Sequence, residues 1–480
     1  MLARIKQLEN TARQLEPDEQ KRNALQTQVL HYSEDFLNRI YELPTFVTCE
    51  DKGAGLLNSP ISEDPIDIDE ALTLLKYNVD GPGLNPASGG HLGYIPGGGI
   101  YTSALGDYLA DVFNRYSGVF YAGPGAVRME NMLLDWMASM VGYPKAAAGN
   151  LTSGGSVANL IGIVTARDAH GLKAKEIEKS VIYLSKQVHH SVDKSLRIAG
   201  LKESVWRYIP LDEKYRMRAD LLEEAIVQDK RSGLMPWLVI ASAGTTDTGA
   251  VDPMVEIGEV AKTHGLWFHL DGAYGAFFVL CEAGKKILTG MHTSDSLVMD
   301  PHKGLFLPYG SGAVLVKDRQ KLLDAHCYMP NYLQDTLSTR DELSPADLSP
   351  ELTKHFRGLR LWLPLKLHGL APFRACLEEK LLLARYFHSR LQEMPGFEVG
   401  PFPDLSVVTF RYLPKRGDPN EFNKRLQQEI QKDGRVFLSS TLLEDTFVIR
   451  LVVLAFRTHL QTIDLTLEIL REKVKFLEAT

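Results

Sequence analysis

The chain has 480 residues, of which 44% are hydrophobic and 24% are charged, so it is long enough to bury a large core together with smaller ones. Its formal net charge is -7 at pH 7, and its pI is about 6.1. No segment is dominated by lysine and arginine, which argues against a nucleic-acid partner and favours a small molecule.

Three parts follow one another along the chain. Residues 1–90 start with helix-like apolar spacing and end in loops, which predicts an N-terminal helical arm. Residues 91–360 alternate helical segments with short apolar strands, which predicts a large α/β domain whose mainly parallel central sheet has helices on both faces. Residues 361–480 predict a smaller C-terminal α+β domain. The expected strands are residues 181–185, 205–211, 236–244, 266–272, 296–300 and 311–317, and two more within 398–413 and 447–458.

A glycine-rich turn lies in the segment LTSGGSVANL. Gly154, Gly155 and Ser156 precede a helix that we expect to begin near Val157. Glycines allow close approach of the backbone, and the free N–H groups of a helix start, together with a serine hydroxyl, form an anion site suited to a phosphate. A simple capping turn would have the same sequence.

Polar side chains follow three of the predicted strands. His189 comes just after the strand VIYLS, Thr245 and Thr246 follow PWLVI, and Asp271 ends FHLD. Ligands of open α/β sheets bind at the carboxyl ends of the strands, so these residues are expected at one edge. A structural histidine or a helix cap would account for any one of them alone.

Lys303 lies between the strands SLVM and GAVLV, both interpreted as buried strands of the parallel sheet. Together with the phosphate turn, the carboxylate of Asp271 and the imidazole of His189, this lysine meets the requirements of pyridoxal phosphate (PLP). The amine forms a Schiff base with the cofactor, and the carboxylate keeps the pyridine nitrogen protonated so that the ring accepts electrons. Lys303, His189 and Asp271 are therefore the predicted catalytic residues.

Five segments together resemble the PLP-dependent amino acid decarboxylases of fold type I, which include aromatic amino acid and glutamate decarboxylases. They are SGGSVAN, GTTDTGAVDP, HLDGAYG, DPHKG and FRGLRLWLPLKLHG, and the resemblance runs from about Gly90 to Thr458. It implies that Lys303 carries the cofactor, that Asp271 pairs with its ring nitrogen and that His189 stacks on the ring. The other residues expected to bind the cofactor are Gly155, Ser156, Thr246, Asp300 and His302.

Three positions depart from the family pattern. Asp300 stands where aromatic amino acid decarboxylases carry an asparagine near the phosphate, and a carboxylate there is repelled unless it is turned away or hydrogen-bonded. Gly97, in the substrate-side segment GGHLGYIP, stands where relatives can have a hydroxyl residue. Counting back from FRGLR without gaps places Pro345 where the family has a loop tyrosine that delivers a proton, and Tyr328 and Tyr332 lie upstream.

The substrate carboxylate has two candidate partners, Arg450 and Arg457 in VIRLVVLAFRT, although an arginine on a strand is more often part of a structural ion pair. Without the loop tyrosine, His189 or a water that it holds is the nearest proton donor.

The remaining features suggest a cytoplasmic setting. The cysteines are scattered without a CxxC pair, so neither a metal site nor a disulfide framework is predicted. No apolar run approaches the roughly 20 residues that a bilayer requires, and no signal peptide is evident. The cysteines are Cys49, Cys281, Cys327 and Cys376.

The sequence therefore predicts a carboxy-lyase that uses PLP to convert an L-amino acid into its amine and CO2. The resemblance also implies a homodimer with active sites at the subunit interface. Two enzymatic alternatives stay open: a carbon–carbon lyase similar to sphingosine phosphate lyase, and an oxidative decarboxylase that forms an aldehyde. A third alternative is a vestigial PLP fold that serves only in assembly.

Overall fold

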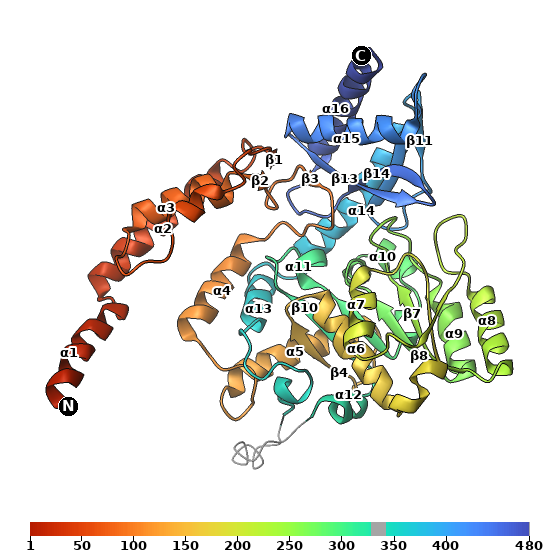
Figure 1. Ribbon diagram of the computed structural model, residues 1–480, viewed down its shortest axis with the longest axis horizontal. Coiled ribbons are helices and arrows are strands. Elements are labelled where there is room, and N and C mark those ends of the chain that lie inside the picture. Colours follow the sequence, from red (N-terminus) through yellow and green to blue (C-terminus); the bar gives the residue numbers. More distant parts are fainter. Residues whose placement is uncertain (328–341, 480) are drawn as a thin grey trace.

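A seven-stranded sheet forms the centre of the computed structural model, which describes residues 1–327 and 342–479 (Figure 1). The strands lie in the order β4, β10, β9, β8, β7, β5, β6, and those from β9 to β6 run parallel. Their bounds are β4 Ala148–Thr152, β5 Ser180–Leu184, β6 Val205–Tyr208, β7 Met235–Ser242, β8 Trp267–Asp271, β9 Ser296–Met299 and β10 Gly312–Val316.

Helices cover both faces of this sheet, as the alternation of strands and helices predicts. Val181 and Tyr183 of β5 pack into one core with α5, α8 and α9, whereas Ile182 and Leu184 pack into another with α6 and α7. Successive side chains of a strand point to opposite faces, so continuous apolar runs are needed where both faces are buried. The bounds are α5 Pro124–Met140, α6 Gly155–Ala169, α7 His190–Ile198, α8 Ala219–Arg231, α9 Met254–His264, α10 Glu282–Ile287 and α12 Arg319–His326.

Three details differ from the sequence-based expectation. Strand β10 is antiparallel to both of its neighbours, because the connection from β9 contains only the four-residue helix α11 (Pro301–Gly304), and a parallel return requires a longer crossover. Helix α6 begins at Gly155 and not near Val157, so the glycine-rich turn forms its first residues. Strand β4, in which Leu151 is the one large apolar residue, was not predicted.

A second sheet of five strands forms the smaller C-terminal part, in the order β11, β12, β14, β13, β3. Helices α14, α15 and α16 contribute Phe387, Leu426 and Leu467 to the core on one face, while Val407 and Val452 join the core of the large sheet. The bounds are β3 His91–Leu92, β11 Phe397–Val399, β12 Val407–Tyr412, β13 Phe437–Leu443, β14 Thr446–Val452, α14 Ala371–Gln392, α15 Pro419–Asp433 and α16 Leu460–Ala479.

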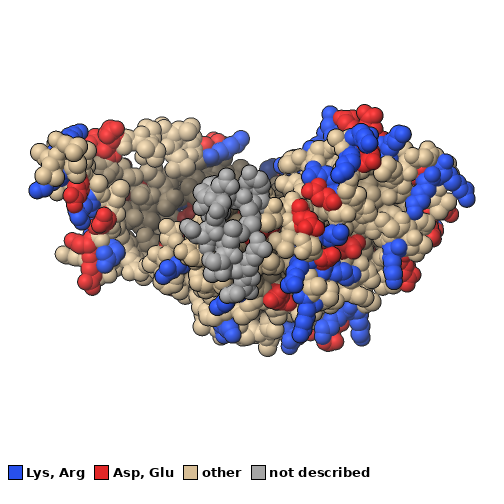
Figure 2. Space-filling view, turned by 90° about the horizontal axis from the view of Figure 1, so that it is seen from below, with Lys and Arg blue, Asp and Glu red and all other residues tan. Residues whose placement is uncertain are grey.

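The N-terminal helices form an arm that projects away from both sheets (Figure 1). None of the residues of α1 (Leu2–Ala12), α2 (Glu19–Asn38) or α3 (Ile68–Leu75) is buried. Figure 2 shows acidic and basic side chains mixed along the arm and on the neighbouring face of the body.

The remaining elements include β1 Phe46–Val47, which pairs with β2 Gly83–Leu84, and the packed helices α4 Tyr101–Phe113 and α13 Gly358–His368. Within the described ranges, no helix has both the length and the apolar character needed to cross a bilayer.

Candidate active site

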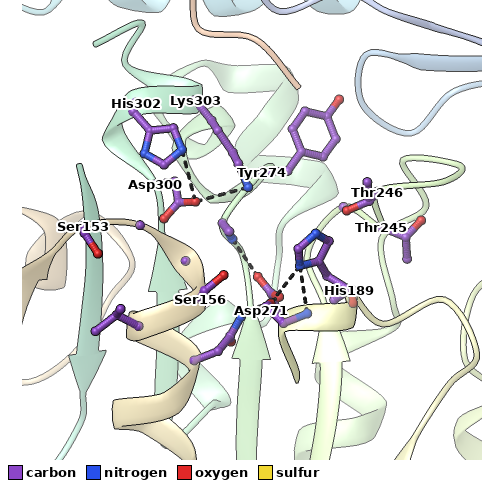
Figure 3. A pocket seen from close by; sticks show the side chains of 18 residues that line it. Ser153, Ser156, His189, Thr245, Thr246, Asp271, Tyr274, Asp300, His302 and Lys303 are labelled. Carbon is purple, nitrogen blue, oxygen red and sulfur yellow. Dashed lines mark hydrogen bonds and ion pairs between the residues drawn. The ribbon is translucent and has the colours of Figure 1, made fainter. Parts of the chain in front are cut away.

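A cavity of about 310 Å³ lies at the carboxyl ends of the central strands (Figure 3). Segments that follow β4, β5, β7, β8 and β9 line it, because parallel strands deliver their connections to the same edge of a sheet. The cavity brings together the predicted catalytic and cofactor-binding residues: Gly155, Ser156, His189, Thr245, Thr246, Asp271, Asp300, His302 and Lys303.

Lys303 reaches the cavity from α11, directly after β9. Its Nζ lies 3.2 Å from Oδ2 of Asp300, whose side chain is 1% exposed. Nε2 of His302 lies 3.7 Å from the same oxygen, and Figure 3 shows both side chains directed at this carboxylate. Burying a carboxylate is costly unless it is paired, and the lysine ammonium pairs it here.

The glycine-rich turn packs against the same carboxylate. A Cβ added to Gly155 would lie 2.9 Å from Oδ2 of Asp300, and one added to Gly312 would lie 2.7 Å from Oδ1. Glycine is therefore required for this close approach. Gly154 precedes α6 and supplies no side-chain cap, so the first N–H groups of this helix are available to an anion.

Asp271 ends β8 and is 7% exposed. Its Oδ1 accepts a hydrogen bond from the N–H of Ala273 at 3.1 Å, and its Oδ2 accepts one from Nδ2 of Asn159 at 3.0 Å. Both oxygens thus act as acceptors, as they do in the carboxylate that pairs with a protonated pyridine nitrogen.

His189 is the residue before α7, where its ring caps the helix. Nδ1 accepts a hydrogen bond from the N–H of Ser191 at 3.2 Å and lies 2.8 Å from the Ser191 hydroxyl. A backbone N–H can only donate, so the proton of the neutral ring is on Nε2. Burial lowers the pKa of His189 below its usual value, although the Asp271 carboxylate opposes this shift. The ring is therefore neutral at pH 7.

Thr246 belongs to a loop that the small sheet holds in place. Arg450, which is 3% exposed, donates to the carbonyl oxygens of Thr246 and Asp247, the latter at 2.9 Å. Arg457 donates to the carbonyls of Ala87 and Gly98 at 3.1 and 3.2 Å. Neither arginine lines the cavity, and both donate to backbone carbonyls around it.

The segment with Gly97 packs directly behind the lysine. A Cβ on Gly97 would lie 2.1 Å from the carbonyl oxygen of His302, so a hydroxyl-bearing side chain is sterically excluded there. Pro345 is buried in a short 3-10 helix, and its carbonyl accepts a hydrogen bond from Asn150 at 2.8 Å. Tyr328 and Tyr332, the alternative sources of a phenol, lie outside the described residues.

The residues that line the cavity and that sequence reasoning did not nominate include Asn159, Ser191 and Tyr274. Ser191 and Tyr274 lie two and three residues after predicted site residues, so proximity along the chain could have identified them. Asn159 lies four residues after Gly155 and thus on the same face of the helix, a spacing that could also have been recognised.

A prediction concerns His269, which is fully buried in β8, two residues before Asp271. Burial lowers its pKa from 6.5 to about 4. Between these values the unfolded chain binds a proton that the folded chain does not, so stability falls as the pH drops through this window. We expect His269 to contribute a loss of roughly 2 kcal/mol between pH 7 and pH 5.

Urea unfolding at both pH values and one protein concentration measures this loss. His269→Gln is the matched variant, because glutamine keeps an N–H donor but does not titrate. The fall in stability should be smaller in the variant; an equal fall in both proteins would show that His269 is not responsible.

The residues around the cavity fit PLP. A helix start free of a side-chain cap suits a phosphate, a buried carboxylate suits a pyridinium nitrogen, and a lysine amine suits an aldehyde. Lys303, Asp271 and the turn at Gly155 line one cavity, as binding to a single molecule requires.

Comparisons with known proteins agree with this arrangement. Residues 88–413 match the family model described as the pyridoxal-dependent decarboxylase conserved domain. An aromatic-L-amino-acid decarboxylase of Bacillus atrophaeus is 36% identical over 430 residues, covering 88% of this chain and 89% of the relative. A phenylacetaldehyde synthase of Arabidopsis thaliana is 27% identical over 437 residues, covering 88% of this chain and 89% of the relative.

Among solved structures, Oryza sativa TDC with PLP and tryptamine matches with a TM-score of 0.90 at 24% identity, covering 96% of this chain and 99% of that one. At this level of identity the match shows a shared fold, which is that of the PLP enzymes of fold type I. The family match covers most of the chain and includes all the cavity segments. The chain therefore belongs to the pyridoxal-dependent decarboxylases and decarboxylates amino acids with PLP as cofactor.

Proposed function

We propose that the substrate is an aromatic L-amino acid and that the products are its amine and CO2. The Bacillus atrophaeus relative, an aromatic-L-amino-acid decarboxylase, supports this substrate class. The observation that carries the chemistry is that the amine of Lys303, the carboxylate of Asp271 and the ring of His189 line one cavity beside an uncapped helix start.

Each residue then has a distinct task. Bound PLP supplies an electron sink for the pair of electrons left when CO2 departs. Lys303 would hold the cofactor through its amine. Asp271 holds the ring nitrogen protonated, and the N–H groups at Gly155 and Ser156 bind the phosphate. His189, with its proton on Nε2, would lie against the ring and is the proposed proton donor to the α-carbon.

A substrate screen tests the proposal. The purified protein, loaded with PLP, is assayed for CO2 and amine with aromatic, acidic, basic and aliphatic L-amino acids. We expect turnover of one or more aromatic substrates at a kcat/KM at least about 100-fold above the others, since a pocket built for a large ring loses several kcal/mol of contact with a small side chain. Preference for glutamate or an aliphatic substrate would contradict the proposed class.

A second candidate is oxidative decarboxylation to an aldehyde. The phenylacetaldehyde synthase relative favours it, as does the count without gaps that places Pro345 at the position of the family's loop tyrosine. Unless an acid delivers a proton to the α-carbon promptly after CO2 departs, oxygen would react there instead. Amine, aldehyde, ammonia and peroxide are therefore measured together in the same assay. Aldehyde and peroxide forming in step with CO2, without amine, would identify the oxidative reaction.

We further propose a cytoplasmic homodimer. The exposed apolar side chains of α4 recur at helical spacing along one stripe, formed by Tyr101, Leu105, Tyr108 and Val112, which are 37 to 60% exposed. A stripe of this kind is typical of a protein interface. Tyr108→Glu with Val112→Glu should convert a dimer into a monomer in sedimentation experiments. A wild-type protein that is monomeric and fully active would contradict the proposal.

A prediction follows from the unusual carboxylate. Asp300→Asn should tighten PLP binding by about 10-fold, because it removes a negative charge beside the turn proposed to hold the phosphate dianion. Dissociation constants of the apoenzyme are measured for PLP and for pyridoxal, which lacks the phosphate. Only the dissociation constant for PLP should fall. Equal changes in the constants for both ligands would show that the substitution acts through Lys303.

A further inference from the structure

Asn159 lies between the two residues that are proposed to contact the cofactor ring. It is 1% exposed in α6, and its Nδ2 donates to Oδ2 of Asp271 at 3.0 Å and to Oγ of Ser191 at 3.1 Å. The Ser191 hydroxyl in turn lies 2.8 Å from Nδ1 of His189. Both hydrogens of one amide are thus used, one toward the carboxylate and the other toward the imidazole.

A buried chain of hydrogen bonds fixes which way this amide points. Nε1 of Trp267 donates to Oγ of Ser296 at 2.8 Å, and this hydroxyl lies 2.7 Å from Nδ1 of His269. Nε2 of His269 lies 2.8 Å from Oδ1 of Asn159. The side chains of Trp267, Ser296 and His269 are all buried and do not line the cavity.

The direction of the whole chain follows from its two ends. An indole N–H can only donate, and an ionised carboxylate can only accept. The amide hydrogens of Asn159 therefore face Asp271 and Ser191, and its oxygen accepts from Nε2–H of His269. The neutral His269 ring has no second N–H, so its Nδ1 accepts from the Ser296 hydroxyl, which accepts from the indole of Trp267. Hydrogen bonds that all run in one direction polarise and strengthen one another. Turning the amide over would place its oxygen against the carboxylate and its NH2 group against an N–H.

We propose that Asn159 is a positioning residue that holds the Asp271 carboxylate and, through Ser191, the Nε2–H form of His189, and that Trp267, Ser296 and His269 lock its orientation. The inference rests on the roles of Asp271 and His189 proposed above. It explains why a polar chain crosses an otherwise apolar core, where unpaired polar groups are costly. Asn159 acts through its neighbours.

The test is a double-mutant cycle on the enzyme loaded with PLP. Asn159→Ala should lower kcat by about 10- to 100-fold, the effect of losing one hydrogen bond to a charged group, and change KM by less than about threefold. In an Asp271→Asn background, where the charged partner is gone, the same substitution should lower kcat by less than about threefold.

A spectroscopic readout accompanies the cycle. The visible absorbance of the bound cofactor, titrated against pH, should shift in Asn159→Ala and, less strongly, in Ser296→Ala, which removes only one hydroxyl outside the cavity. Asn423→Ala is the matched control. Asn423 is another buried asparagine, bonded to the backbone of Tyr412 in the small domain, and its loss should cost stability without moving the spectrum.

The possible outcomes distinguish a failure of the positioning role of Asn159 from a failure of the proposed function. Equal losses of kcat in both backgrounds, or unshifted spectra in Asn159→Ala and Ser296→Ala, would overturn the positioning role. If Asn159→Ala does not fold, the kcat values in both backgrounds and the spectrum are measured for Ser296→Ala instead. An Asp271→Asn enzyme with normal activity would instead overturn the proposed role of Asp271.

Discussion

Replacing Lys303 with alanine should abolish covalent attachment of the cofactor and lower kcat by a factor of about 10⁴ or more. The amine of this residue lies in the cavity on a short helix directly after β9, within 3.2 Å of Asp300. Without it, an amino acid must react with the free cofactor aldehyde, and no lysine returns to release the product. The measurement is borohydride reduction of the loaded enzyme followed by mass spectrometry of its peptides.

Two further variants separate the role of the Lys303 amine as a nucleophile from its role as a positive charge. Lys303→Arg keeps a cation beside Asp300 but cannot form the reducible bond, so it should bind the cofactor and remain inactive. Lys317→Ala is the matched control, because Lys317 follows the next strand, β10, and donates to the carbonyl of Thr293 outside the cavity. A reducible adduct that persists in Lys303→Ala would assign the attachment to another lysine.

Asp271→Asn should leave the cofactor bound and lower kcat by roughly 10³-fold. The neutral amide is close in size to the carboxylate but cannot hold the ring nitrogen protonated, so the electron sink weakens. The substitution also replaces one of two acceptor oxygens with an NH2 group, although the N–H of Ala273 and Nδ2 of Asn159 both donate at this position. Cofactor content by absorbance and kcat for the best substrate are measured on the same sample.

The control for this substitution is Asp229→Asn. Asp229 is also buried, but it pairs with Arg207 at 2.8 Å and accepts from the Tyr183 hydroxyl, away from the cavity. This variant should lose stability while its folded fraction keeps kcat. Turnover near that of the wild type in Asp271→Asn would refute the assigned role, whereas loss of the cofactor would show that the carboxylate is needed for binding itself.

The local sequence was enough to predict which side chains lie at the edge of the sheet that forms the cavity. His189, Thr246, Asp271 and Lys303 each follow a short apolar run, and a run of that kind between helical segments indicates a buried strand. Because parallel strands end at the same edge, placing the strands also placed these side chains. The glycine turn at residues 154–156 was equally predictable, since glycine and serine before a helix indicate a helix start that can bind an anion, whatever packs around it.

The direction of β10 and the partners of the buried polar groups depended on tertiary structure. The antiparallel return of β10 brings Gly312 against Asp300, a contact that neither segment shows by itself. Arg450 was assigned a possible substrate role from its type, but the small sheet packs it against the loop of Thr246.

The residues that the sequence by itself determined are therefore those whose function depends on position along a strand or at a helix start. The hydrogen-bonded chain through Asn159 and His269 was decided only by tertiary structure. One residue lies inside a helix and the other inside a strand, 110 residues apart. Helical and strand periodicity predicts that such residues face a core, but it does not specify which polar atom in that core meets them. Only the packing of α6 across β8 decides that.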